Sequence, residues 1–94
     1  MHDHHPARHR RDQAPVVLTE TVMFADLRVE VRVTSPAPTV YRFTARGTWG
    51  NREWSVGSEL TGKRRGTFIL RAAARQLAEQ LKAQVLADIR GDDQ

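Results

Sequence analysis

The stretch LRVEVRVT, residues 27–34, decides the fold, because apolar and polar side chains alternate along it without a break. Leu27, Val29, Val31 and Val33 fall on one side of an extended chain, and the charged or hydroxyl side chains between them fall on the other. A period of two is typical of a β-strand with one face buried and one face in water. We therefore predict a sheet that is covered on one side only.

Three neighbouring segments repeat this pattern. Residues 39–46, TVYRFTAR, and residues 52–60, REWSVGSEL, alternate in the same way, which places Trp54 on the buried side. Residues 16–24, VVLTETVMF, alternate more loosely, because Glu20 interrupts the apolar side. These segments are expected to be strands that follow one another along the chain.

The connections between the strands contain residues that favour turns. SPAP at 35–38 carries two prolines, which are expected to end strand pairing and form a connection. GTWGN at 47–51 carries glycines and an asparagine that tolerate a positive φ, so we predict a tight hairpin turn there. The segments on either side of each connection are then antiparallel.

The last third of the chain changes to a helical period. From Thr67 to about Arg90, apolar residues recur three and four positions apart, at Leu70, Ala74, Leu77, Ala78, Leu81, Val85 and Ile89. TFIL at 67–70 is open to two interpretations. Phe68 and Ile69 favour a short strand before the helix, whereas Thr67 could instead cap a first helical turn. We expect the strand.

Together these segments predict an α+β domain over residues 16–91. It consists of an antiparallel β-meander of four to five strands with one C-terminal helix packed on one face, in two layers. Residues 1–15 form a basic, histidine-rich segment that we expect to be a disordered tail, and residues 92–94 are expected to be a disordered C-terminus.

The composition excludes several classes of protein. The 94 residues include no cysteine, so the chain has neither a disulfide framework nor a zinc site with sulfur ligands. No apolar run is long enough to cross a membrane, and the N-terminus lacks the apolar segment of a secretory signal. We expect a cytoplasmic protein without a cofactor, a structural metal or a membrane partner. The formal net charge of +4 favours polyanionic partners.

The uncovered face of the predicted sheet has two interpretations. Arginines and glutamates on adjacent strands can form weak cross-strand pairs on a solvated surface. Alternatively, the arginines form a patch that continues into the loop before the helix and follows a phosphate backbone. The residues of this candidate site are Arg28, Arg32, Arg42, Arg46, Lys63, Arg64 and Arg65. Trp49, in the predicted turn, and Arg52, directly after it, add an exposed ring beside a cation.

The helix is expected to extend past the end of the sheet. Its last turns carry Val85, Leu86 and Ile89, and an apolar overhang of this kind usually meets another chain. We therefore predict a homodimer with these three residues in the interface.

The order of elements resembles single-stranded-nucleic-acid binders built from four antiparallel strands and one helix. The passage Gly62-Lys63-Arg64-Arg65-Gly66-Thr67-Phe68-Ile69-Leu70 resembles the segment before the helix in the transcriptional coactivator family known as positive cofactor four, to which the Whirly proteins are similar in architecture. The resemblance implies dimerisation through the helices and DNA held across the sheet, with Lys63, Arg64 and Arg65 as contacts. Unlike that family, this chain has no aromatic residue after Phe68.

An enzyme is the class that the sequence favours least. All four histidines lie in the tail, and neither the serines nor the carboxylates occur in a catalytic pattern. The favoured hypothesis is a non-catalytic nucleic-acid-binding protein, with single-stranded DNA or RNA as the ligand. The alternative is a small protein-interaction or assembly module, or an inhibitor, that acts as a homodimer. Readers of double-stranded nucleic acid built from strands and a helix also remain open.

Overall fold

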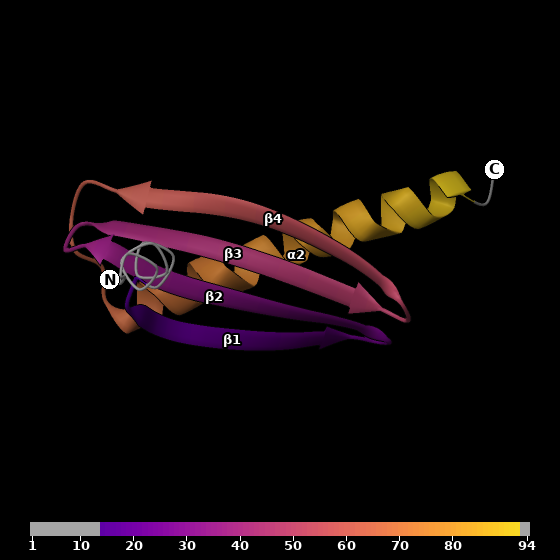
Figure 1. Ribbon diagram of the computed structural model, residues 1–94, viewed down its shortest axis with the longest axis horizontal. Coiled ribbons are helices and arrows are strands. Elements are labelled where there is room, and N and C mark those ends of the chain that lie inside the picture. The colour runs from indigo at the N-terminus through magenta and orange to yellow at the C-terminus, as the bar shows by residue number, and fades with distance from the viewer. Residues whose placement is uncertain (1–13, 93–94) are drawn as a thin grey trace, which may run out of the picture.

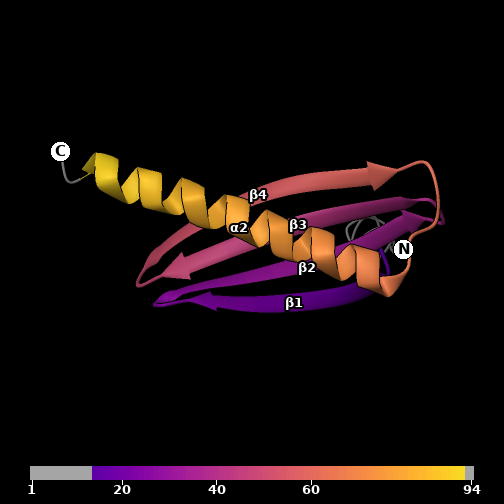
Figure 2. The same ribbon diagram turned by 180° about the vertical axis from the view of Figure 1, so that it is seen from behind.

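The computed structural model describes residues 14–92 and contains one sheet and one helix. The strands β1 (Val16–Phe24), β2 (Leu27–Ala37), β3 (Val40–Trp49) and β4 (Arg52–Thr61) form an antiparallel meander in the order β1-β2-β3-β4. The helix α2 (Thr67–Asp92) lies diagonally across one face of the sheet and leaves the other face open (Figures 1 and 2). The predicted two-layer α+β fold is confirmed.

Two-residue turns close the first and third hairpins. Phe24 pairs with Leu27 around a turn in which Ala25 has a φ of 55°, and Trp49 pairs with Arg52 around a turn in which Gly50 has a φ of 63°. The second of these turns is shorter than the predicted turn at 47–51, because β3 continues through Trp49.

Gly47, which the sequence placed in the turn, lies within β3 and faces the helix. A Cβ on Gly47 would lie 3.1 Å from Cδ2 of Leu81 in α2, so the backbone of β3 approaches the helix closely at Gly47. The glycine therefore serves close packing rather than the turn.

The prolines of residues 35–38 do not end β2 where the sequence predicted. Ala37 still pairs with Val40. The pairing register shifts between Thr34 and Ala37, so Ser35 and Pro36 lie outside the regular ladder. The Ser35 hydroxyl donates a hydrogen bond to the carbonyl oxygen of Ala37 at 2.7 Å. A β-bulge thus accommodates Pro36, and the strand continues to the next turn.

The core lies between the sheet and α2, and its members are those that the alternation and the helical period predicted. The buried side chains are Leu18, Leu27, Val29, Val31, Val33, Tyr41, Phe43, Ala45, Leu70, Ala74, Leu77, Ala78, Leu81 and Val85. Trp54 faces this core as predicted, and it is half-buried at the margin on β4.

The expectation of a short strand at 67–70 is wrong. The backbone N–H of Leu70 donates to the carbonyl oxygen of Gly66 at 3.0 Å, which is the first hydrogen bond of the helix. Leu70 enters the core with 1% exposure, while Phe68 and Ile69 point outward. Phe68 and Ile69 favour a strand locally, but burial of Leu70 in the core favours the helical conformation over this segment.

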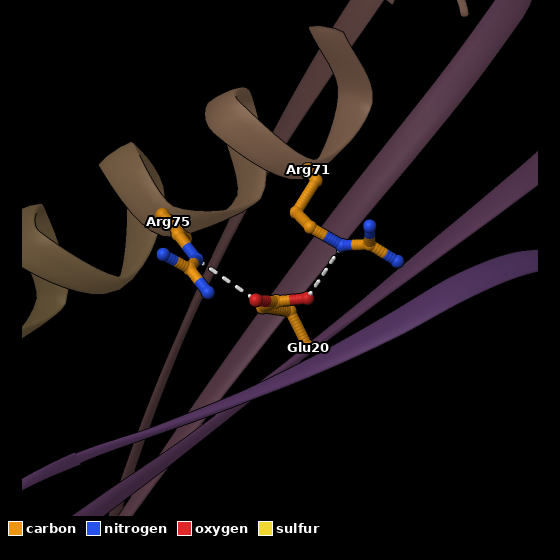
Figure 3. Close-up of polar contacts among 3 residues, drawn as sticks. All are labelled: Glu20, Arg71 and Arg75. Carbon is orange, nitrogen blue, oxygen red and sulfur yellow. Dashed lines mark hydrogen bonds and ion pairs between the residues drawn. The ribbon is translucent and has the colours of Figure 1, made fainter. Parts of the chain in front are cut away.

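Glu20, which interrupts the apolar side of β1, is a docking point for the helix. Its two carboxylate oxygens accept hydrogen bonds from Nε of Arg71 at 3.0 Å and from Nε of Arg75 at 2.8 Å (Figure 3). The hydrogen bond from Arg75 lowers the pKa of Glu20, with a further contribution from Arg71, against the opposing effect of burial. The charge on the inner face is therefore compensated by two cations of α2.

Residues 1–13 of the predicted tail, which spans residues 1–15, lie outside the described residues, as do residues 93 and 94. Its described end is joined to the sheet, because the carbonyl oxygen of Pro15 accepts a hydrogen bond from the backbone N–H of Ser35 at 3.0 Å.

Candidate nucleic-acid interface

The outer face is the side of the sheet that α2 does not cover, and its register aligns four arginines. Arg42 lies opposite Thr34, Arg32 opposite Thr44, Arg46 opposite Glu30, and Arg28 opposite Thr48. The four therefore alternate between the central strands β3 and β2, with each step two residues, or about 7 Å, along the strands. We call this zigzag series Arg42, Arg32, Arg46 and Arg28 the arginine row.

Two members of the arginine row have carboxylate partners on β4. Nε of Arg42 lies 3.0 Å from Oε2 of Glu59, and Nη2 of Arg46 lies 3.3 Å from Oε2 of Glu53. All four side chains are about half exposed or more, so these are solvated cross-strand pairs of the kind that stabilise a fold by less than about 1 kcal/mol. At these positions the interpretation as a solvated surface is supported.

The other two members of the row differ from this pattern. Arg28 and Arg32 are exposed, and within residues 14–92 no ion pair is formed by either guanidinium. Arg32 lines a shallow hollow of about 750 Å³ on the outer face. Its other lining residues are Ala14, Pro15, Val16, Glu30, Thr34, Thr44, Arg46 and Ser55. Two arginines, three hydroxyl side chains and the carboxylate of Glu30 thus line this hollow together with three apolar residues.

Residues 62–66, here called the basic loop, connect β4 to α2 around the end of the sheet. Gly62 has a φ of 108°, a value that favours glycine and lets the chain leave β4 sharply. Lys63 and Arg64 are exposed, and neither is ion-paired within the described part of the chain. These two cations are available to a ligand.

Arg65 belongs to the scaffold of the loop. Its backbone N–H donates to the Tyr41 hydroxyl at 3.0 Å, and its Nη2 donates to the carbonyl oxygen of Thr61 at 3.3 Å. The Tyr41 hydroxyl in turn donates to the carbonyl oxygen of Pro38 at 3.4 Å. Arg65 therefore holds the loop against the turn between β2 and β3, in contrast to its two neighbours.

The predicted position of Trp49 is wrong. Trp49 follows Tyr41, Phe43, Ala45 and Gly47 on the side of β3 that faces α2, and it packs half-buried against the core. The alternation of β3 extends further than the predicted turn allowed, and it carries the ring to the face opposite the arginine row.

Arg52 lies in a different cluster from the one predicted. Its Nη2 lies 3.5 Å from Oδ2 of Asp88 in α2, and its guanidinium carbon lies 4.9 Å from the centre of the Trp54 ring. The Trp54 Nε1–H also donates to Oδ2 of Asp88, at 2.8 Å. Arg52, Trp54 and Asp88 together fix the far part of α2 to β4.

The predicted dimer contacts also need correction. The last turns of α2 extend beyond the sheet as expected (Figures 1 and 2), but Val85 is completely buried within the chain. Ile89 packs partly against the same core, and Leu86 is half-buried. Because the core reaches further along α2 than the sequence indicated, these residues do not form a free apolar surface.

Phe68 is an exposed aromatic ring that the sequence interpretation missed. It lies in the first turn of α2, directly after the basic loop, and 82% of its surface is exposed. The helical interpretation of TFIL would have identified it, because a helix that buries Leu70 turns the residue two positions earlier outward. The exposed ring that follows the basic loop in the chain is thus Phe68, and Trp49 is not exposed in this way.

Two further observations on the described residues concern metal ions and membranes. Within residues 14–92, no group of three or more histidine, cysteine, aspartate or glutamate side chains could hold a metal ion. None of the described helical residues forms a segment long and apolar enough to cross a membrane. Comparison with protein-family models, with curated proteins and with solved structures finds no match.

Proposed function

We propose that this chain is a non-catalytic nucleic-acid-binding protein that holds single-stranded DNA or RNA along the arginine row and the basic loop. The observation that carries the proposal is the register of β2 and β3, which aligns four arginines on the face that α2 leaves open. Regularly spaced cations on an open sheet suit a repeating phosphate backbone.

The unpaired cations are the central contacts in this proposal. Arg28 and Arg32 have no described carboxylate partner, so they can neutralise phosphates without first losing an ion pair. Arg42 and Arg46 would have to exchange Glu59 and Glu53 for a phosphate. We therefore expect Arg28 and Arg32 to contribute more to binding than Arg42 and Arg46.

The basic loop and Phe68 extend this surface around the end of the sheet. Lys63 and Arg64 supply two exposed charges, and the Phe68 ring supplies a surface on which one base can stack. The proposal predicts weak sequence preference and a strong dependence on salt, because backbone contacts carry no base information. A cytoplasmic location would bring the protein into contact with such ligands.

Fluorescence anisotropy with labelled single-stranded and duplex oligonucleotides tests the proposal. Arg64→Glu reverses a charge in the basic loop, and Arg90→Glu reverses an exposed charge in the last turn of α2 as the matched control. We expect Arg64→Glu to raise the dissociation constant about tenfold, equivalent to about 1.4 kcal/mol, and Arg90→Glu to have little effect. Equal effects of the two substitutions, or binding that ignores salt, would exclude this interface.

A further inference from the structure

The outer edge of β1 is an open row of backbone hydrogen-bonding groups. Phe24 and Leu27 close a two-residue turn and so form a hydrogen-bonded pair, which directs the even-numbered residues of this part of β1 toward β2. The N–H and C=O groups of Thr19, Thr21 and Met23 consequently point away from the sheet. Because β1 is the first strand in the sheet order, no described strand pairs with them (Figure 1).

This edge lacks the features that usually prevent pairing with another chain. From Leu18 to Phe24 the strand contains no proline, no lysine or arginine, and no bulge. Its one charge, Glu20, is already neutralised by Arg71 and Arg75. Val16, Val17 and Met23 are three of the five large hydrophobic residues that the described chain exposes.

The opposite edge of the sheet is protected. The charged side chains of β4 are ion-paired as well, but those of Arg52, Glu53 and Glu59 are 46%, 61% and 48% exposed, against 11% for Glu20. Gly57 also interrupts the side chains of β4. The two free edges of the same sheet therefore differ, and only β1 lacks exposed charged side chains along the strand.

We propose that a second copy of this chain pairs with the β1 edge, antiparallel and about a two-fold axis at Thr21. The overlap then runs over the whole uninterrupted part of the strand, Leu18 to Phe24. On the outer side Thr19 lies opposite Met23 of the second copy. On the inner side Leu18 lies opposite Phe24, and Glu20 lies opposite Val22, of the second copy.

Repulsion between carboxylates disfavours the register in which the two-fold axis passes through Glu20. An axis at Glu20 would place two carboxylates directly opposite each other, which destabilises a strand pair. With the axis at Thr21, the backbone N–H and C=O groups that point to the open edge all find partners in the second copy. These are the groups of Thr19, Thr21 and Met23. The dimer contains one continuous eight-stranded sheet, twice the four strands of the single chain. This inference stands independently of nucleic-acid binding.

Sedimentation equilibrium measures whether the chain dimerises through the β1 edge, with two matched proline substitutions. Thr21→Pro removes an N–H that points to the open edge of β1, so the hydrogen bonds to β2 remain. Ser55→Pro is the equivalent change on β4, because Trp49 and Arg52 close the third hairpin and turn the Ser55 N–H to the other edge. We expect a dimer for the wild type and for Ser55→Pro, and a monomer for Thr21→Pro.

Cysteine cross-linking tests the register and does not depend on how well the proline variants fold. The chain contains no cysteine, so Thr21→Cys introduces a single thiol. At the axis the two Cα atoms lie about 5.5 Å apart, within the range of a disulfide. In Thr19→Cys, the two thiols are offset by four residues, about 13 Å along the strands. Thr21→Cys is expected to form a covalent dimer on mild oxidation, and Thr19→Cys is not.

Three results would overturn the inference. These are a monomeric wild type at about 100 µM, a dimer that Thr21→Pro leaves intact in a folded variant, and cross-linking of Thr19→Cys as fast as that of Thr21→Cys.

Discussion

The Tyr41 hydroxyl accepts a hydrogen bond from the backbone N–H of Arg65 at 3.0 Å and so fixes the end of the basic loop to β3. The two groups are 24 residues apart in the chain. This contact explains why three consecutive cations have two different roles. Arg65 is bound to the scaffold, and Lys63 and Arg64 are held outward at a defined place.

Tyr41→Phe should therefore destabilise the fold. The substitution keeps the buried ring and leaves the partly buried N–H of Arg65 without its acceptor, which costs about 1–2 kcal/mol of unfolding free energy. Urea denaturation monitored by tryptophan fluorescence measures the change. A Tyr41→Phe variant as stable as the wild type would show that water replaces the hydroxyl at no cost.

Gly47 should be sensitive to a larger side chain, because Cδ2 of Leu81 would lie 3.1 Å from its Cβ and would have to shift. We expect Gly47→Val to destabilise the fold by about 1–3 kcal/mol through overpacking. Gly57→Val is the matched control in β4, where the nearest atom is 3.5 Å away and the position is exposed. Thermal unfolding of both variants provides the comparison. If both variants lost the same stability, the cost of replacing Gly47 would come from the flexibility of the strand and not from contact with α2.

Glu20 should make stability depend on acid pH. Its pKa is lowered in the folded protein chiefly by the hydrogen bond from Arg75, so the carboxylate stabilises the fold above its ordinary pKa of 4.5. This stabilisation is lost as the pH falls through the lower pKa of the folded state. Glu20→Gln should be less stable than the wild type at pH 7, and the difference should shrink as the pH falls below 4.5.

Denaturation midpoints between pH 7 and pH 3 test this dependence, with Glu59→Gln as the control. Glu59 also pairs with an arginine, but in an exposed position on the outer face. A pH dependence that is the same in Glu20→Gln and in the wild type would assign the acid sensitivity to other groups.

Phe68 should contribute to binding and not to stability. Because 82% of its surface is exposed, Phe68→Ala should leave the unfolding temperature nearly unchanged. If a base stacks on the ring, the same substitution lowers the affinity for single strands by about 1–3 kcal/mol. Ile69→Ala, the adjacent aliphatic residue with 47% exposure, is the control for a merely hydrophobic effect. Equal affinities of the wild type and Phe68→Ala would remove the ring from the interface.

The strands and the face that each residue occupies could be predicted from the sequence, because alternation is a local signal. Val29, Val31, Phe43 and Ala45 lie where the pattern placed them. The end of β3 could not be predicted this way, since Gly47 and Gly50 are equally suited to a turn. In the structure Gly50 lies in the turn and Gly47 lies against Leu81, which is distant in the sequence.

Three features of the surface depended on contacts between distant segments. Glu20 looked like a break in β1 because its partners, Arg71 and Arg75, are 51 and 55 residues away. The arginine row needed the register of β2 and β3, which the local pattern does not give. Trp49 packs against the core and Phe68 is exposed, because β3 continues through Trp49 and the helix already begins at Thr67.

The salt dependence of single-strand binding tests the central claim most directly. The slope of log K against log salt measures how many phosphates the protein neutralises, at about 0.7 for each contact with a single strand. If Arg32 and Arg28 hold phosphates, Arg32→Gln should reduce this slope by about 0.7 and the double variant Arg28→Gln with Arg32→Gln by about 1.4. Arg90→Gln, an exposed residue at the end of α2, should leave it unchanged. A wild type whose binding does not vary with salt, or a double variant with the wild-type slope, would contradict the assignment of the arginine row as the nucleic-acid interface.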